Sequence, residues 1–208
     1  MDKSITTTEI LKKSIAAGIM IGIGATVKLC CDNQILGALL FSIGLFFICN
    51  SNMLLFTGRI GYINKKNWTE YPLIWFGNLL GCEISMGLIK LAKPELQERV
   101  THIMETKLNM GIIPLAILSF FCGVLMFLAV NNFKPSTSEN AKQYGIIFSV
   151  IVFLISGYEH SIANMAYSIL YISNGFDVLK CFHVITVSTL FNAIGSIFIK
   201  KLLVKRGN

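Results

Sequence analysis

Three long stretches of the chain contain no Asp, Glu, Lys or Arg, and they constrain the fold more than any other feature. Residues 33–58, 108–133 and 181–199 are each close to the roughly 20 residues that a helix needs to cross a bilayer. Only 14% of the chain is charged and 54% is hydrophobic, whereas about a quarter of an ordinary soluble domain is charged. Lipid must therefore surround most of the chain, and we expect an all-α integral membrane protein.

A shorter apolar stretch, residues 14–27, follows Lys12 and Lys13 as a secretory signal would. Lys28 and a further span come next instead of a cleavage site, so we interpret the stretch as a retained helix. The six cysteines mostly lie in apolar runs without CxxC spacing, which favours small buried apolar side chains over disulfides or metal ligands. We expect no metal site and no cofactor.

Charged and Pro, Asn or Ser residues divide the chain into six apolar spans that form one transmembrane domain over residues 1–208. The spans are expected near residues 10–29, 35–63, 69–91, 110–132, 143–170 and 178–200.

Basic residues predict the orientation of these spans. An even number of spans places both termini on one side, and that side carries twice as many Lys and Arg residues as the other. The positive-inside bias then places both termini in the cytoplasm, with the chain in the inner (cytoplasmic) membrane. Anionic lipid explains the net charge of +7, so no nucleic-acid partner is needed.

Two of the spans contain polar groups that a lipid-facing helix would not tolerate. The second carries residues 50–52, Asn-Ser-Asn, and the fifth carries residues 157–161, Gly-Tyr-Glu-His-Ser. Irregular backbone at membrane depth survives only inside protein or beside a cavity, so both spans should be broken there. The breaks occupy equivalent places in the two halves of the chain, which indicates an aquaporin-like inverted repeat with a site at the midplane.

Several polar residues near the breaks are candidates for function. His160 can exchange a proton near neutral pH, and Glu159 beside it is expected to bind backbone amides freed by the break. Thr57 could bind an anion or orient the imidazole, although Thr hydroxyls often bond helical carbonyls instead. From its position alone, Lys107 could be either an anion-attracting residue or a solvated anchor.

Residues 157–165 read Gly-Tyr-Glu-His-Ser-Ile-Ala-Asn-Met, and this run resembles the signature of the formate/nitrite transporter family. Residues 55–58, Leu-Phe-Thr-Gly, and 76–78, Phe-Gly-Asn, resemble further family motifs in the expected order. Residues 107–109 and Cys122 do so as well. The resemblance covers the chain from about residue 14 to residue 199.

The resemblance implies a homopentamer in which each subunit has its own pore. It places Thr57 and His160 at the centre, Asn164 beside them and Lys107 in a vestibule where it gathers the anion. The family has Asn after the span-four Cys, so Gly123 is expected to remove an amide from the outer side of the pore. The resemblance also implies hydrophobic constrictions at Phe41, Leu45, Leu55, Phe56 and Phe153.

The function expected from this resemblance is a channel or facilitator for formate, nitrite or hydrosulfide. In that hypothesis His160 or a linked water supplies the proton that lets the anion cross as a neutral acid. An intramembrane enzyme using Glu159 and His160 is a second hypothesis, but no further ligand or nucleophile is evident, so we expect no enzyme. A structural membrane protein without transport activity is the remaining alternative.

Overall fold

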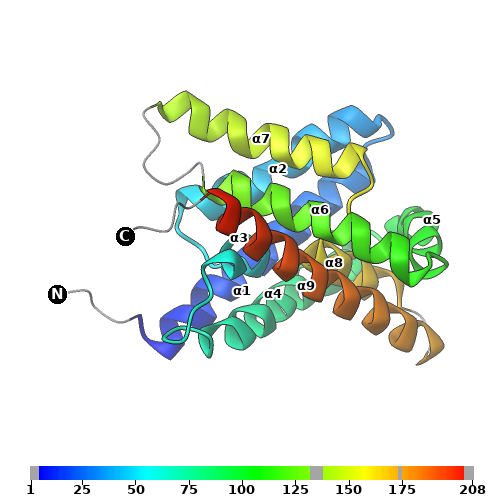
Figure 1. Cartoon of the computed structure of the whole chain (residues 1–208). Helices are drawn as coiled ribbons and strands as arrows, with labels where there is room; N and C mark the ends of the chain where they lie inside the picture. The colour runs from blue at the N-terminus through cyan, green and yellow to red at the C-terminus, as the bar shows by residue number, and fades with distance from the viewer. Residues whose placement is uncertain (1–4, 132–137, 173–174, 204–208) are drawn as a thin grey trace, which may run out of the picture.

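The computed structural model describes residues 5–131, 138–172 and 175–203, and it consists of helices joined by short connections (Figure 1). The extreme termini and residue 132 of the expected 110–132 span lie outside the described residues. A 3₁₀ turn, η1 (Ile60–Tyr62), follows α3. The α-helices are α1 (Thr7–Cys30), α2 (Gln34–Asn50), α3 (Phe56–Arg59), α4 (Glu70–Ala92), α5 (Leu96–Leu108), α6 (Ile112–Asn131), α7 (Glu139–Ile155), α8 (Ser161–Tyr171) and α9 (Gly175–Leu203).

Side-chain caps in the sequence start several of these helices. The Thr6 hydroxyl accepts from the Glu9 amide before α1, and the Asn33 carbonyl oxygen accepts from the Leu36 amide before α2. Ser138 caps α7 in the same way. These caps satisfy amides that have no partner within the first helical turn.

Four of the described helices, α1, α4, α6 and α9, are long and apolar enough to cross a membrane, and α2 is a shorter apolar helix. Large apolar side chains are exposed on the outside of the helices: Ile113 on α6 is 70% exposed, and Phe148 on the neighbouring α7 is 61% exposed. Exposed apolar surface of this extent is unfavourable in water and favourable in lipid or between subunits. These helices support the expectation of an integral membrane protein.

The backbone is irregular at the two places where polar clusters interrupt the sequence. Helix α2 ends at Asn50 and α3 begins at Phe56, while α7 ends at Ile155 and α8 begins at Ser161. Asn52 (φ 52°) and Gly157 (φ 65°) adopt left-handed conformations in these two segments. Asn and Gly reach that region at the lowest steric cost, so the local sequence permits both turns.

Helix α5 was not predicted, because its segment is too polar to register as an apolar run. Leu96, Val100 and Met104 recur every fourth residue and bury one face of the helix. Arg99 fixes the helix to the end of α1 through the Leu29 carbonyl oxygen at 3.1 Å and the Asp32 carboxylate at 2.8 Å. Figure 1 shows α5 at the opposite end of the bundle from the start of α1 and the end of α9.

Close backbone contacts join α1 to α4 and α6 to α9. A Cβ at Gly18 would overlap the carbonyl oxygen of Asn78, and a Cβ at Gly123 would overlap that of Asn192. The expectation that Gly123 removes an amide from the pore is therefore wrong, since no side chain fits at this position. Gly123 lets α6 and α9 approach each other.

Candidate functional site

The first irregular segment is held by one buried amide, Asn78 on α4. Its Oδ1 accepts from the Phe56 amide at 2.9 Å, and its Nδ2 donates to the carbonyl oxygens of Leu54 and Ser14, both at 2.8 Å. Asn78 is fully buried. A carboxamide suits this position because it accepts and donates without carrying a charge.

The second segment has an equivalent residue, Asn192 on α9. Its Oδ1 accepts from the Ser161 amide at 2.9 Å, and its Nδ2 donates to the carbonyl oxygens of Glu159 at 2.8 Å and Ser119 at 2.7 Å. Sequence analysis assigned no role to either asparagine. The signal that could have revealed Asn192 is an amide in the middle of an uncharged span.

Thr57 and His160 meet where the two segments end. The Thr57 Oγ1 lies 2.8 Å from the His160 Nε2, and both residues are buried. The Nδ1 of His160 accepts from the Ala163 amide at 3.0 Å and so caps α8. An Nδ1 that accepts an N–H carries no proton, so the neutral imidazole carries its proton on Nε2 and donates it to the Thr57 hydroxyl. The hydroxyl proton of Thr57 is then available to another acceptor.

Two cavities lie on opposite sides of this pair. A cavity of about 530 Å³ includes Leu118, near the start of α6, and one of about 110 Å³ includes Val130, near its end. The helix rises about 18 Å between these two residues. Ser196 relates the pair to α6, because its Oγ lies 3.3 Å from the Thr57 carbonyl oxygen and 2.9 Å from that of Gly123. Gly123 lies between Leu118 and Val130 on α6. The Thr57–His160 pair therefore lies at mid-depth in the helix bundle, between the two cavities.

An ion pair lines the larger cavity. The Lys107 Nζ lies 2.7 and 2.6 Å from the two Glu159 carboxylate oxygens, and the side chains are only 13% and 3% exposed. Asn164 Nδ2 donates to Glu159 Oε2 at 2.9 Å. The expectation that Glu159 binds freed backbone amides is wrong: Asn192 binds the Ser161 amide, and the Glu159 carboxylate neutralises Lys107. The structure thus brings together Lys107, Glu159 and Asn164, a connection that sequence analysis missed.

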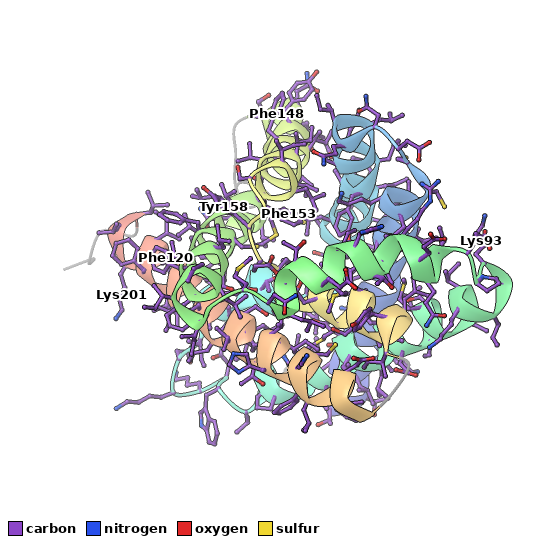
Figure 2. The ribbon with its side chains drawn as sticks, turned by 90° about the vertical axis from the view of Figure 1, so that its right-hand side faces the viewer. Lys93, Phe120, Phe148, Phe153, Tyr158 and Lys201 are labelled. Carbon is purple, nitrogen blue, oxygen red and sulfur yellow. The ribbon has the colours of Figure 1, made fainter. Side chains whose placement is uncertain are left out.

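Aromatic rings adjoin the central pair. Phe41 and Phe153 contact edge to face with ring centroids 5.9 Å apart, and the Phe153 ring lies 5.7 Å from that of His160. Figure 2 shows Phe153 from the end of the bundle that α5 covers. Leu45 is buried, and Leu55 lines the smaller cavity.

Phe56 does not join this group. Its ring packs edge to face on Tyr71 with centroids 6.4 Å apart, and it lines a separate open hollow with Trp68 and Trp75. Only the backbone amide of Phe56, which donates to the Asn78 Oδ1, faces the first irregular segment. The other four predicted constriction residues therefore remain candidates, and Phe56 does not.

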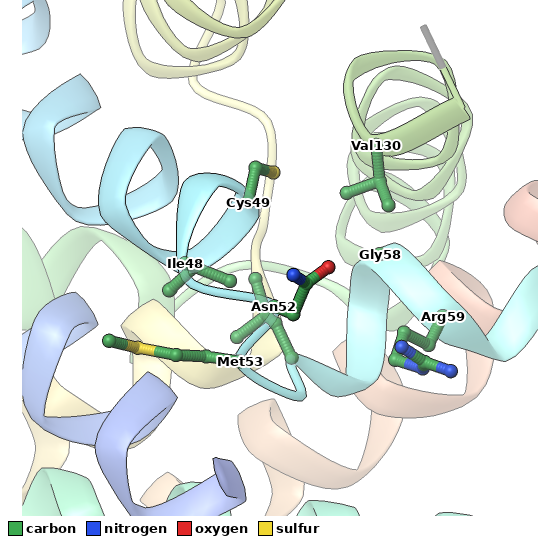
Figure 3. Close-up of a pocket in the computed structure, with 8 residues that line it drawn as sticks. Ile48, Cys49, Asn52, Met53, Gly58, Arg59 and Val130 are labelled. Carbon is green, nitrogen blue, oxygen red and sulfur yellow. The ribbon is translucent and has the colours of Figure 1, made fainter. Parts of the chain in front are cut away.

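The smaller cavity lies beside the first break, and Figure 3 shows its lining residues. Cys49, Asn52 and Met53 come from the end of α2 and the turn after it, and Arg59 comes from the end of α3. Sequence analysis gave Arg59 no role of its own. Its place in the lining puts a cation beside this cavity.

No group of three or more His, Cys, Asp or Glu residues that could hold a metal ion occurs in the described part of the chain. All six cysteines are free, and Cys82, Cys122 and Cys181 are buried.

The family model for the formate/nitrite transporters matches residues 2–204 of the chain. An uncharacterised transporter of Bacillus subtilis is 28% identical over 177 residues, 74% of this chain and 69% of that protein. The formate channel of Escherichia coli K12 is 27% identical over 150 residues, 64% of this chain and 52% of that protein. The nitrite transporter of Salmonella typhimurium is 28% identical over 174 residues, 73% of this chain and 64% of that protein.

Two solved structures share the fold. A pentameric formate channel with formate bound superposes with a TM-score of 0.81 at 24% identity and covers 94% of this chain and 95% of its own. An ion channel of the same family superposes with a TM-score of 0.84 at 24% identity and covers 94% of this chain and 88% of its own. These relatives are transporters and channels, and none of them is named as an enzyme.

Proposed function

Because the chain belongs to the formate/nitrite transporter family, we propose that it is a channel or facilitator for a small monovalent weak-acid anion, with proton transfer at His160. Formate and nitrite are the first candidates, since relatives carry those names, and hydrosulfide is the third. The proposal goes beyond the anion-channel function that the family and its relatives support.

The observation that carries the proposal is the buried Thr57–His160 pair at mid-depth between two cavities. Phe41 and Phe153 adjoin the pair, and Leu55 lines the smaller cavity beyond it. An ion that moves past such apolar side chains loses its hydration free energy, and the side chains offer no polar contact in return. A neutral acid loses much less hydration free energy. A proton delivered to the anion near the Thr57–His160 pair would therefore favour its passage as a neutral acid.

The hydrogen bonds of His160 set the conditions for that transfer. In the neutral form, the imidazole can orient an anion only through Nε2–H and the adjoining Thr57 hydroxyl. The ring can give up its Nε2 proton and stay neutral only if Nδ1 takes up a proton. A protonated Nδ1 can no longer accept from the Ala163 amide. Protonation of His160 is thus coupled to loss of its cap on α8.

The same proposal includes the membrane topology. Helices α2 and α3 form the second of six crossings and α7 and α8 the fifth, each broken in the middle. The matched roles of Asn78 and Asn192, and of Gly18 and Gly123, support an inverted repeat. The basic-residue bias supports cytoplasmic termini in the inner membrane. The likeness to a pentameric formate channel supports a homopentamer.

Uptake into proteoliposomes tests the proposal. Formate, nitrite, hydrosulfide and chloride are compared at pH 5 and pH 7.5 in wild type, His160→Phe and His160→Asn. Asparagine caps helices well but cannot exchange a proton, so it separates the capping role from proton transfer. We expect one weak-acid anion to enter faster at low pH, with that preference lost in both variants.

Two results would count against the proposal. If no anion enters faster than into empty liposomes, the transport function fails. If His160→Asn keeps the full low-pH preference, transport stands but proton transfer at His160 does not.

A further inference from the structure

An aromatic hollow of about 450 Å³ opens between α4, α9 and the turn that precedes α4. Its lining includes Phe56, Trp68, Tyr71, Trp75 and Thr189. None of these five residues lines either cavity beside the central pair. Both α4 and α9 are long and apolar enough to cross a membrane, so the aromatic hollow faces lipid or a neighbouring subunit.

The polar atoms of two lining rings are already paired. The Trp75 Nε1 donates to the Thr189 Oγ1 at 3.1 Å, and the Tyr71 hydroxyl donates to the Arg59 carbonyl oxygen at 3.1 Å. Their apolar faces remain for contact with an occupant. A polar ligand would find no partner at these rings, so the aromatic hollow favours a hydrocarbon chain.

The position of the aromatic hollow along α4 matches one surface of a membrane. Trp68 lies just before α4 begins at Glu70 and is 59% exposed, whereas Trp75 lies five residues into the helix. The helix rises about 8 Å over those five residues. Tryptophan is enriched where a membrane meets water, because its ring is apolar and its N–H is polar. The aromatic hollow therefore extends from the membrane surface into the hydrocarbon, as an acyl chain does below its headgroup.

The turn before α4 places two cations beside the opening. Lys65 and Lys66 are exposed and lie between two lining residues, Ile63 and Trp68. Neither lysine forms an ion pair with a described carboxylate within 4.0 Å. Both ammonium groups are therefore available to an anion at the membrane surface.

Neighbouring charges leave this rim positive. Residues 59–70 contain three basic residues and one carboxylate, Glu70, and so carry a net charge of +2. Lys200 of α9 adds a further cation, since its Nζ lies 5.0 Å from the centroid of the Tyr62 ring. The headgroup of an anionic phospholipid is the complementary charge at this depth.

We propose that the aromatic hollow binds an anionic phospholipid, with one acyl chain against Trp68 and Trp75 and the phosphate beside Lys65 and Lys66. A second copy of the chain fits this rim less well, because it carries a net charge of +7, whereas a phosphate complements the lysines. The inference goes beyond the proposed function and does not depend on transport.

The first test uses the protein's own fluorescence. Trp68 and Trp75 are the two tryptophans of the chain, so its tryptophan fluorescence reports on the aromatic hollow. Phospholipids with brominated acyl chains quench a tryptophan that they contact. Brominated phosphatidylglycerol and brominated phosphatidylcholine are compared in reconstituted protein, each diluted with unbrominated phosphatidylcholine. We expect phosphatidylglycerol to associate about ten- to thirtyfold more strongly, at about fivefold for each lysine.

Charge variants test the lysines. Lys65→Gln and Lys66→Gln should each lower the preference for phosphatidylglycerol about fivefold, and the double variant should lose most of it. Lys65→Arg/Lys66→Arg should keep it, and 1 M salt should weaken it in wild type, because salt screens the charges. Lys93→Gln removes the same charge at the other end of α4, at the edge of the molecule in Figure 2, and should keep the full preference.

Variants with one tryptophan test the acyl chain. Trp75→Phe leaves Trp68 as the reporter, and Trp68→Phe leaves Trp75. Bromine close to the headgroup should quench Trp68 more than Trp75, and bromine further along the chain should quench Trp75 more. The reverse order would contradict the proposed direction of the chain.

The second test is stabilisation in detergent. Phosphatidylglycerol added to the solubilised protein should raise its melting temperature, because a ligand that binds only the folded state stabilises it. Phosphatidylcholine at the same concentration is the reference, and excess glycerol phosphate, which has no acyl chains, should have no effect. The shift should be smaller in Lys65→Gln/Lys66→Gln than in wild type and in Lys93→Gln.

Three results would overturn the proposal. Equal quenching by the two brominated lipids in wild type would show that the aromatic hollow does not select an anionic lipid. Absence of quenching by either lipid would show that something else, such as a neighbouring subunit, covers it. A full thermal shift with glycerol phosphate alone would show that the lysines bind a free anion. If selective quenching is found but no anion is transported, the lipid site stands and the transport function fails.

Discussion

Lys107 and Glu159 form a buried ion pair, and a buried pair responds to mutation differently from an exposed one. Removing one partner leaves the other charged and without compensation, whereas removing both can be nearly neutral. Asn164 adds a hydrogen bond to the same carboxylate. The pair therefore provides a stability test of the roles assigned to its members.

We predict that Lys107→Met lowers the free energy of unfolding by about 3–5 kcal/mol. The double variant Lys107→Met/Glu159→Gln should recover most of this loss, because a glutamine carbonyl can still accept from Asn164. Unfolding followed by circular dichroism in detergent measures both. Equal losses in the single and double variants would show that the ion pair is not the source of the effect.

The elements around the breaks depend on single asparagines. Helices α4 and α9 each place one amide against a non-helical segment, where it replaces hydrogen bonds that the missing helical turns would have made. In hydrocarbon, no water is available to replace them. The breaks should therefore fail when these amides are removed.

We predict that Asn192→Ala lowers the free energy of unfolding by several kcal/mol, at about 1–3 kcal/mol for each buried group left unpaired. Asn109→Ala, at an exposed position, is the matched control and should cost less than about 1 kcal/mol. Chemical denaturation in detergent compares them. If the two variants lose similar stability, Asn192 does not hold the second break.

Contact between α6 and α9 allows a second test at this scale. Gly123→Ala should reduce both melting temperature and uptake, since its Cβ overlaps the Asn192 carbonyl oxygen. Gly87→Ala on α4 meets no atom within 4 Å and should be neutral or stabilising by up to about 1 kcal/mol. A stable, active Gly123→Ala variant would contradict the packing role of Gly123.

At the scale of the whole molecule, both cavities and the central pair lie within a single chain. If the protein forms the proposed homopentamer and each subunit has its own pore, mixed pentamers of wild-type and transport-inactive subunits should show flux proportional to the number of wild-type subunits. Purification by two different affinity tags isolates mixtures of known ratio. A single inactive subunit that abolishes flux would indicate a shared pathway instead.

Sequence alone determined the features that depend on neighbouring residues. Uncharged runs indicated membrane helices, and the polar clusters at residues 50–52 and 157–161 indicated where the backbone becomes irregular. The motif at residues 157–165 indicated the family. Hydropathy, backbone preference and motif identity are local properties, so they can be read before the chain is folded.

Only the tertiary structure decided which distant groups meet. Lys107 lies 52 residues from Glu159, and their pairing depends on how α5 docks near the second break. The same holds for Asn192 and for the aromatic hollow that Phe56 shares with Trp75. Side-chain direction, burial and pairing depend on helix packing, and no local pattern in one sequence specifies which faces of two distant helices come together.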